Sequence, residues 1–88
     1  MPDIDSNLLK LGRALRQMRE NRGLTQTEVA RRAGIPRLKV IHVEAGRTGV
    51  SAKAYVRVAA ALGGELQVKP VARPTLDEIG ALLADEGL

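Results

Sequence analysis

Apolar residues recur at helical spacing in four stretches of the chain, and this pattern predicts four helices. The first stretch covers residues 6–21 and ends before Gly23; the fourth covers residues 52–62, and Ser51 can cap it. Steps of three and four place the apolar residues on one face of each helix. These residues are Leu8, Leu11, Leu15 and Met18 in the first helix, and Tyr55, Val58, Ala59 and Leu62 in the fourth.

The second and third predicted helices are joined by a very short turn. Thr25 and Glu28 have the spacing of a capping box, which predicts a helix start. Gly34 can adopt the left-handed conformation that ends a helix, and Pro36 is tolerated only at or near the start of the next one. The apolar positions are Val29, Ala30 and Ala33 before the turn, and Ile35, Val40 and Val43 after it.

This pair of helices resembles the helix-turn-helix of Cro and the phage repressors, the XRE family. The shared features are a small residue within the first helix (Ala30), a glycine in the turn (Gly34), and apolar residues that lock the helices together. The resemblance implies an all-α, lambda-repressor-like four-helix domain whose second motif helix enters the major groove of double-stranded DNA. The alternative is an ordinary helical hairpin within an all-α core.

Charge favours the DNA-binding interpretation without deciding it. The net charge is +4, but residues 1–64 carry twelve Lys or Arg against five Asp or Glu, a surplus of +7, whereas residues 65–88 carry a net charge of −3. A basic body attracts polyanions such as nucleic acid. A merely solubilising charged surface is the alternative.

Several functional classes find no support in the composition. There is no cysteine and a single histidine, so no constellation for catalysis or metal binding is evident, and we predict neither enzymatic activity nor a cofactor. No apolar run reaches the roughly 18 residues of a membrane span. We therefore expect a cytoplasmic protein without a membrane partner.

The chain changes character after Gly63 and Gly64, which divides it into a DNA-binding domain (residues 1–64) and a C-terminal segment (residues 65–88). Residues 65–71 alternate polar and apolar, which predicts a strand. A lone strand needs a partner, most simply its copy in a homodimer, where the two would form an intersubunit two-stranded sheet. The residues assigned to this dimerisation strand are Leu66, Gln67, Val68 and Lys69.

A short acidic helix is predicted to follow from Thr75, with Leu76, Ile79, Leu82 and Leu83 on one side. It is too short to be stable alone, so it packs either on its own dimer or on another protein. In the strand after the helical body the chain is similar to the HipB-type antitoxins of the same superfamily, which dimerise through a small intersubunit sheet.

The helix-turn-helix pattern also predicts which residues meet DNA. The predicted base-contacting residues, on the second motif helix, are Arg37, Leu38, Lys39, Ile41 and His42. Lys39 could reach a phosphate instead of a base, and a plain surface role is an equal alternative for His42. The predicted phosphate-contacting residues are Gln26, Thr27, Arg47 and Thr48. The resemblance further implies a structural ion pair between Arg19 and Glu44.

Two functions are compatible with these features. The first is a sequence-specific transcriptional regulator, most simply a repressor, that binds an inverted-repeat operator as a homodimer. The second is an antitoxin that neutralises a partner toxin and represses their shared operon through the same helix-turn-helix.

Overall fold

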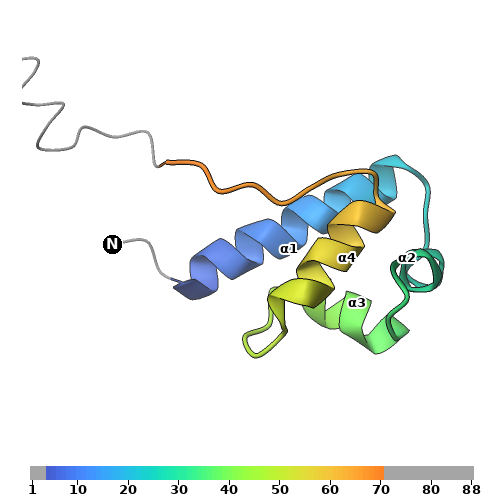
Figure 1. Ribbon diagram of the computed structural model, residues 1–88, viewed down its shortest axis with the longest axis horizontal. Coiled ribbons are helices and arrows are strands. Elements are labelled where there is room, and N and C mark those ends of the chain that lie inside the picture. Colours follow the sequence, from blue (N-terminus) through green and yellow to red (C-terminus); the bar gives the residue numbers. More distant parts are fainter. Residues whose placement is uncertain (1–3, 71–88) are drawn as a thin grey trace, which may run out of the picture.

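Four helices make up the described part of the chain. The computed structural model describes residues 4–70, and the helices are α1 (Ile4–Asn21), α2 (Gln26–Ala33), α3 (Arg37–Glu44) and α4 (Ala52–Ala61). Figure 1 shows α1 and α4 on one side of the bundle, with α3 below them and α2 at one end. These bounds agree with the four predicted stretches, apart from an earlier start of α1 and an α4 that ends one residue sooner.

The turn between α2 and α3 is formed as the sequence predicts. The Thr25 side chain accepts a hydrogen bond from the backbone N–H of Glu28 at 3.1 Å, which caps the start of α2. Gly34 ends α2 with φ 69° and ψ 35°, the left-handed conformation that a glycine adopts at little cost. Pro36 stands directly before α3 in an extended conformation, so the two helices are separated by only three residues.

Helix α3 is the centre of the bundle, because it packs against each of the other three helices. Its inward residues Val40 and Val43 are completely buried, as are Val29 of α2 and Val58 of α4. The other members of the buried core are Leu15, Ala30, Ala54, Tyr55, Ala59 and Leu62. Most of these residues are the ones whose helical spacing predicted the core; Ala54 is an addition, and the predicted residues Leu8, Leu11 and Met18 are only partly buried against it.

Two glycines allow α1 to cross the C-terminal end of α3 at close range. A Cβ added to Gly12, in the middle of α1, would lie 2.6 Å from the backbone oxygens of both Val43 and Glu44. A Cβ on Gly46 would lie 2.7 Å from the backbone oxygen of Leu8. A side chain at either position would push the backbones apart, so these two positions fix how α3 is mounted on α1.

Helix α4 closes the bundle. Ser51 caps it, since its Oγ accepts a hydrogen bond from the N–H of Ala54 at 3.3 Å. Tyr55 is buried, and its hydroxyl donates to the backbone oxygen of Arg47 at 3.4 Å. Burial raises the pKa of the Tyr55 phenol, so the hydroxyl remains a protonated donor. This bond ties the loop after α3 to α4.

The predicted dimerisation strand is not confirmed by the single chain. Residues 65–70 form no strand here; they turn back in the direction of the end at which α1 begins (Figure 1). Val68 is fully exposed and Leu66 is 37% exposed. Residue 71, the last of the predicted strand, and the helix predicted from Thr75 lie outside the described residues.

Candidate nucleic-acid interface

Helix α3 presents two opposite faces. Val40 and Val43 face the core, whereas Arg37, Leu38 and Lys39 are exposed at its N-terminal end. Leu38 is 59% exposed, although α3 packs against three other helices. We call Arg37 and Leu38 the reading end of α3, since both are exposed at the point where the helix begins.

Ile41 and His42 lie one turn further along α3 and are only partly exposed. Nε2 of His42 lies 3.3 Å from a guanidinium nitrogen of Arg47 in the following loop. Because arginine can only donate, this contact requires Nε2 of His42 to be the acceptor. The structure thus brings together one predicted base-contacting residue and one predicted phosphate-contacting residue.

The C-terminal end of α3 is held by an ion pair with α1. Nε of Arg19 donates to Oε2 of Glu44 at 2.6 Å, and a second guanidinium nitrogen donates to Oε1 at 3.1 Å. Both side chains are largely buried, at 12% and 4% exposure. The hydrogen bond to Glu44 raises the pKa of Arg19 above its already high ordinary value, so the guanidinium of Arg19 stays charged.

Gln26 connects this ion pair to the reading end. Its amide nitrogen donates to Oε1 of Glu44 at 3.1 Å, and its amide oxygen accepts from the guanidinium of Arg37 at 3.5 Å. A chain of hydrogen bonds therefore runs from Arg19 through Glu44 and Gln26 to Arg37. Gln26 was predicted as a phosphate contact; here its side chain orients Arg37.

The other predicted phosphate-contacting residues are accessible. Thr27 is exposed in the first turn of α2, and Arg47 and Thr48 are exposed in the loop that follows α3. This loop directly follows α3 in the chain, and the first turn of α2 is linked to α3 through the hydrogen bonds of Gln26 to Glu44 and Arg37. Groups on both sides of a reading helix can hold it in register against a DNA backbone.

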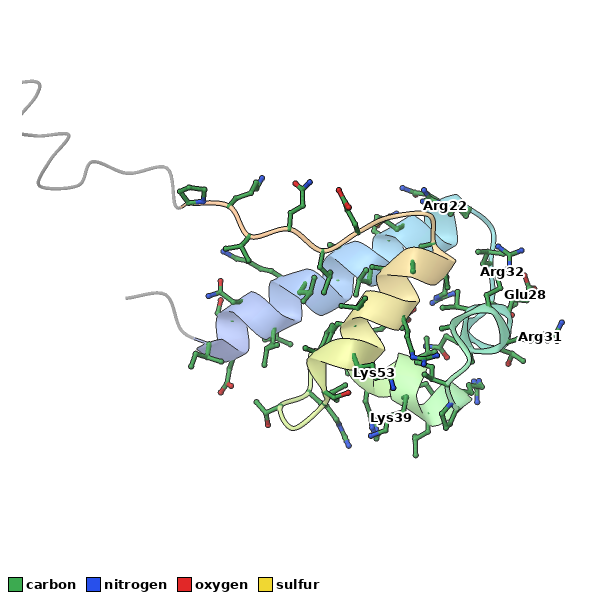
Figure 2. The ribbon with its side chains drawn as sticks, in the orientation of Figure 1. Arg22, Glu28, Arg31, Arg32, Lys39 and Lys53 are labelled. Carbon is green, nitrogen blue, oxygen red and sulfur yellow. The ribbon has the colours of Figure 1, made fainter. Side chains whose placement is uncertain are left out.

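Two basic residues of α4 were missed by the sequence analysis. Lys53 and Arg57 line the same surface hollow as Lys39 of α3, and Figure 2 shows Lys39 and Lys53 on neighbouring helices. Their spacing of four residues indicates that they lie on the same face of α4, because residues i and i+4 share a helix face. The spacing does not indicate that this face lies against α3.

A second group of basic side chains lies elsewhere. Arg31 and Arg32 project from α2 and Arg22 follows α1, away from Lys39 and Lys53 (Figure 2).

Within residues 4–70, no cluster of three or more side chains that could hold a metal ion occurs. In that same part of the chain, no helix has the length and apolar content that crossing a membrane requires.

Comparison with protein families agrees with this geometry. The helix-turn-helix domain family matches residues 10–68, most of the chain and all of the helical bundle beyond the first turns of α1. The chain therefore belongs to the helix-turn-helix domain family, and it is a DNA-binding protein of the kind that the XRE-type resemblance implied. Comparisons with curated proteins and with solved structures give no match.

Proposed function

We propose that this protein is a sequence-specific transcriptional regulator that represses a promoter by occupying its operator. The observation that carries the proposal is the contrast between the two ends of α3. The Arg19–Glu44 ion pair fixes its C-terminal end, and Arg37 and Leu38 are exposed at its N-terminal end. A helix held in this way can enter a major groove end-on.

Arg37 and Leu38 suit two different base contacts. The planar fork of Arg37 matches the two acceptors of a guanine, a contact that discriminates against other bases by about 1–3 kcal/mol. Leu38 offers only apolar contact, which suits the methyl group of a thymine. His42 and Ile41 lie where they could touch the next bases. The proposal assigns the chain no catalytic activity.

A homodimer is part of the proposal. Leu66 and Val68 are exposed apolar residues on a segment that pairs with no strand among residues 4–70, which supports their pairing with a second copy. Two-fold symmetry would place the two reading helices about 34 Å apart, one turn of DNA, and would require an inverted-repeat operator.

The proposal is tested by selecting binding sites from a random duplex library with the full chain. We expect an enriched inverted repeat, bound at least about 1,000-fold more tightly than a scrambled duplex of equal length at the same salt concentration. If no sequence is enriched, or if selected and scrambled duplexes bind alike, sequence-specific regulation is wrong.

The dimer is tested by sedimentation of the full chain and of a chain ending at Gly64. Removing residues 65–88 should convert dimers to monomers and weaken operator binding, because only one half-site is then engaged. An intact dimer in the shortened chain would instead place the interface within the four helices.

The antitoxin alternative rests on the same exposed residues. Leu66 and Val68 could pair with a toxin as well as with a second copy of the chain, and the sequence after position 70 is acidic, opposite in charge to residues 1–64. A toxin-like reading frame beside the gene, whose growth inhibition is relieved by coexpressing this chain, would favour it. If coexpression of this chain does not relieve the growth inhibition, the antitoxin alternative is wrong and only the transcriptional regulator is left.

A further inference from the structure

A cation-lined hollow lies beside the reading end of α3, on the side that faces α4. Its volume is about 260 Å³, and it opens to solvent between the α2–α3 turn and the first half of α4. Ile35, Pro36 and Ala54 supply apolar surface, and Lys39, Lys53 and Arg57 supply three positive charges.

The positive charge of this hollow is not neutralised by the protein around it. None of its lining residues is acidic, and within residues 4–70 the ion pairs are Arg16–Glu20 and Arg19–Glu44, which involve none of its three cations. Three cations gathered without a carboxylate repel one another and favour an anion between them.

Arg57 is held in place at the hollow. One of its terminal guanidinium nitrogens donates to the backbone oxygen of Ala33, at the end of α2, at 3.1 Å. This bond fixes the plane of the guanidinium and leaves other N–H groups available. An arginine fork held in this way, together with two lysine ammonium groups, fits the tetrahedral oxygens of a phosphate.

The size of the hollow limits what it can hold. Pockets for whole small molecules usually measure about 300–1,000 Å³, so a space of about 260 Å³ that is open on one side suits one phosphate group with part of an attached sugar. Pro36 and Lys39, which line the hollow, are the neighbours in the chain of Arg37 and Leu38, so the hollow lies beside the reading end.

We propose that this hollow binds a phosphate group, and that the backbone of the DNA read by α3 supplies it. Lys39 then anchors the backbone together with Lys53 and Arg57, rather than contacting a base. The claim that DNA supplies the phosphate rests on the proposed function. The claim that the hollow binds a phosphate group is independent of it, because inorganic phosphate or a phosphorylated small molecule offers the same oxygens.

The first test compares Lys53→Gln with Lys10→Gln in the full chain. Both residues are exposed lysines and each substitution removes one charge, but Lys10 lies on α1 and does not line the hollow. Affinity for a non-specific duplex is measured by fluorescence anisotropy against salt concentration. For Lys53→Gln the slope of log K against log salt should fall in magnitude by about 1, and for Lys10→Gln it should stay unchanged.

The second test titrates the full chain with inorganic phosphate and follows the backbone amides of Gly34 and Ala54 by NMR. Saturable shifts that disappear in Lys39→Gln/Lys53→Gln support a phosphate site. If these shifts occur while the salt slope of Lys53→Gln equals that of the unchanged protein, the source is a small phosphorylated ligand instead of DNA.

The proposal is overturned if neither measurement responds to the loss of Lys53. The proposed function fails in a different way: if the unchanged protein binds no duplex at all, the DNA-binding role is wrong, and the phosphate titration still decides whether the hollow holds an anion.

Discussion

The two ends of α3 differ in almost every physical respect. At the C-terminal end, Val43 and Glu44 are buried and Glu44 receives hydrogen bonds from both Arg19 and Gln26. At the N-terminal end, Arg37 and Leu38 are exposed, and the one hydrogen bond that orients Arg37 is 3.5 Å long. The helix is fixed at one end so that the other end can approach a ligand without the bundle having to rearrange.

This contrast separates stability from recognition. Substitutions at the buried end should change the free energy of unfolding and affect DNA binding only through the placement of α3. Substitutions at the reading end should change base preference and leave stability nearly unaltered. The four predictions that follow test this separation, beginning with the largest effect.

Glu44→Ala should destabilise the protein most. It leaves the guanidinium of Arg19 largely buried without its carboxylate, and the loss of one partner of a buried pair costs about 3–5 kcal/mol. Urea denaturation measures the change. Arg19→Met/Glu44→Leu removes both charges and should be clearly more stable than Glu44→Ala. Equal stability of the two variants would show that the uncompensated charge is not the cause.

Gly12→Ala should be the next most costly change. Its Cβ would lie 2.6 Å from two backbone oxygens of α3, and overpacking of this kind costs about 1–3 kcal/mol, although alanine recovers up to about 1 kcal/mol of helix propensity. Thermal unfolding measures the effect. The control is Arg13→Ala at the next, exposed position of α1, which should change stability by less than about 0.5 kcal/mol. An unchanged melting temperature for Gly12→Ala would contradict the close crossing.

Arg37→Ala should leave stability unchanged and reduce sequence discrimination. The difference in binding free energy between the selected operator and one with its guanine replaced should fall by about 1–3 kcal/mol, because the bidentate contact is lost. Competition binding at fixed salt measures that difference. A variant that still discriminates as strongly as the unchanged protein would exclude Arg37 as a reader of bases.

Leu38→Ala should have the smallest overall effect of the four substitutions. At 59% exposure the side chain contributes little to the core, and we expect a stability change within about 0.5 kcal/mol. Selection of binding sites with the variant should then show a weaker thymine preference at a single position of the half-site. A large loss of stability would mean that Leu38 packs against the rest of the chain.

The pattern of apolar residues was sufficient to predict the helices and most of the core. Helical periodicity predicts that Val40, Val43 and Val58 are buried. The caps at Thr25 and Ser51 are predictable because each side-chain oxygen accepts a hydrogen bond from the backbone N–H three residues later. The pairing of Arg19 with Glu44 came from the family resemblance, since no local pattern joins residues that are 25 positions apart.

The hydrogen-bond partners of Gln26 and the location of the α4 cations beside α3 could not be predicted from the sequence. A glutamine at the start of a helix suggests a phosphate contact, but whether its side chain turns to Glu44 and Arg37 depends on how α2 crosses α3. Likewise Lys53 and Arg57 become part of a site only because α4 lies against the α2–α3 turn. Distances between helices are set by packing, which periodicity does not describe.

The sequence by itself determined four amphipathic helices, a turn that only glycine and proline make short, and an excess of positive charge in residues 1–64. These depend on interactions between near neighbours in the chain, which are readable from spacing. The tertiary structure decided how closely α1 crosses α3 at Gly12, which face of α3 remains exposed, and which cations meet in the hollow. These depend on contacts between distant segments, whose geometry exists only once the core has packed.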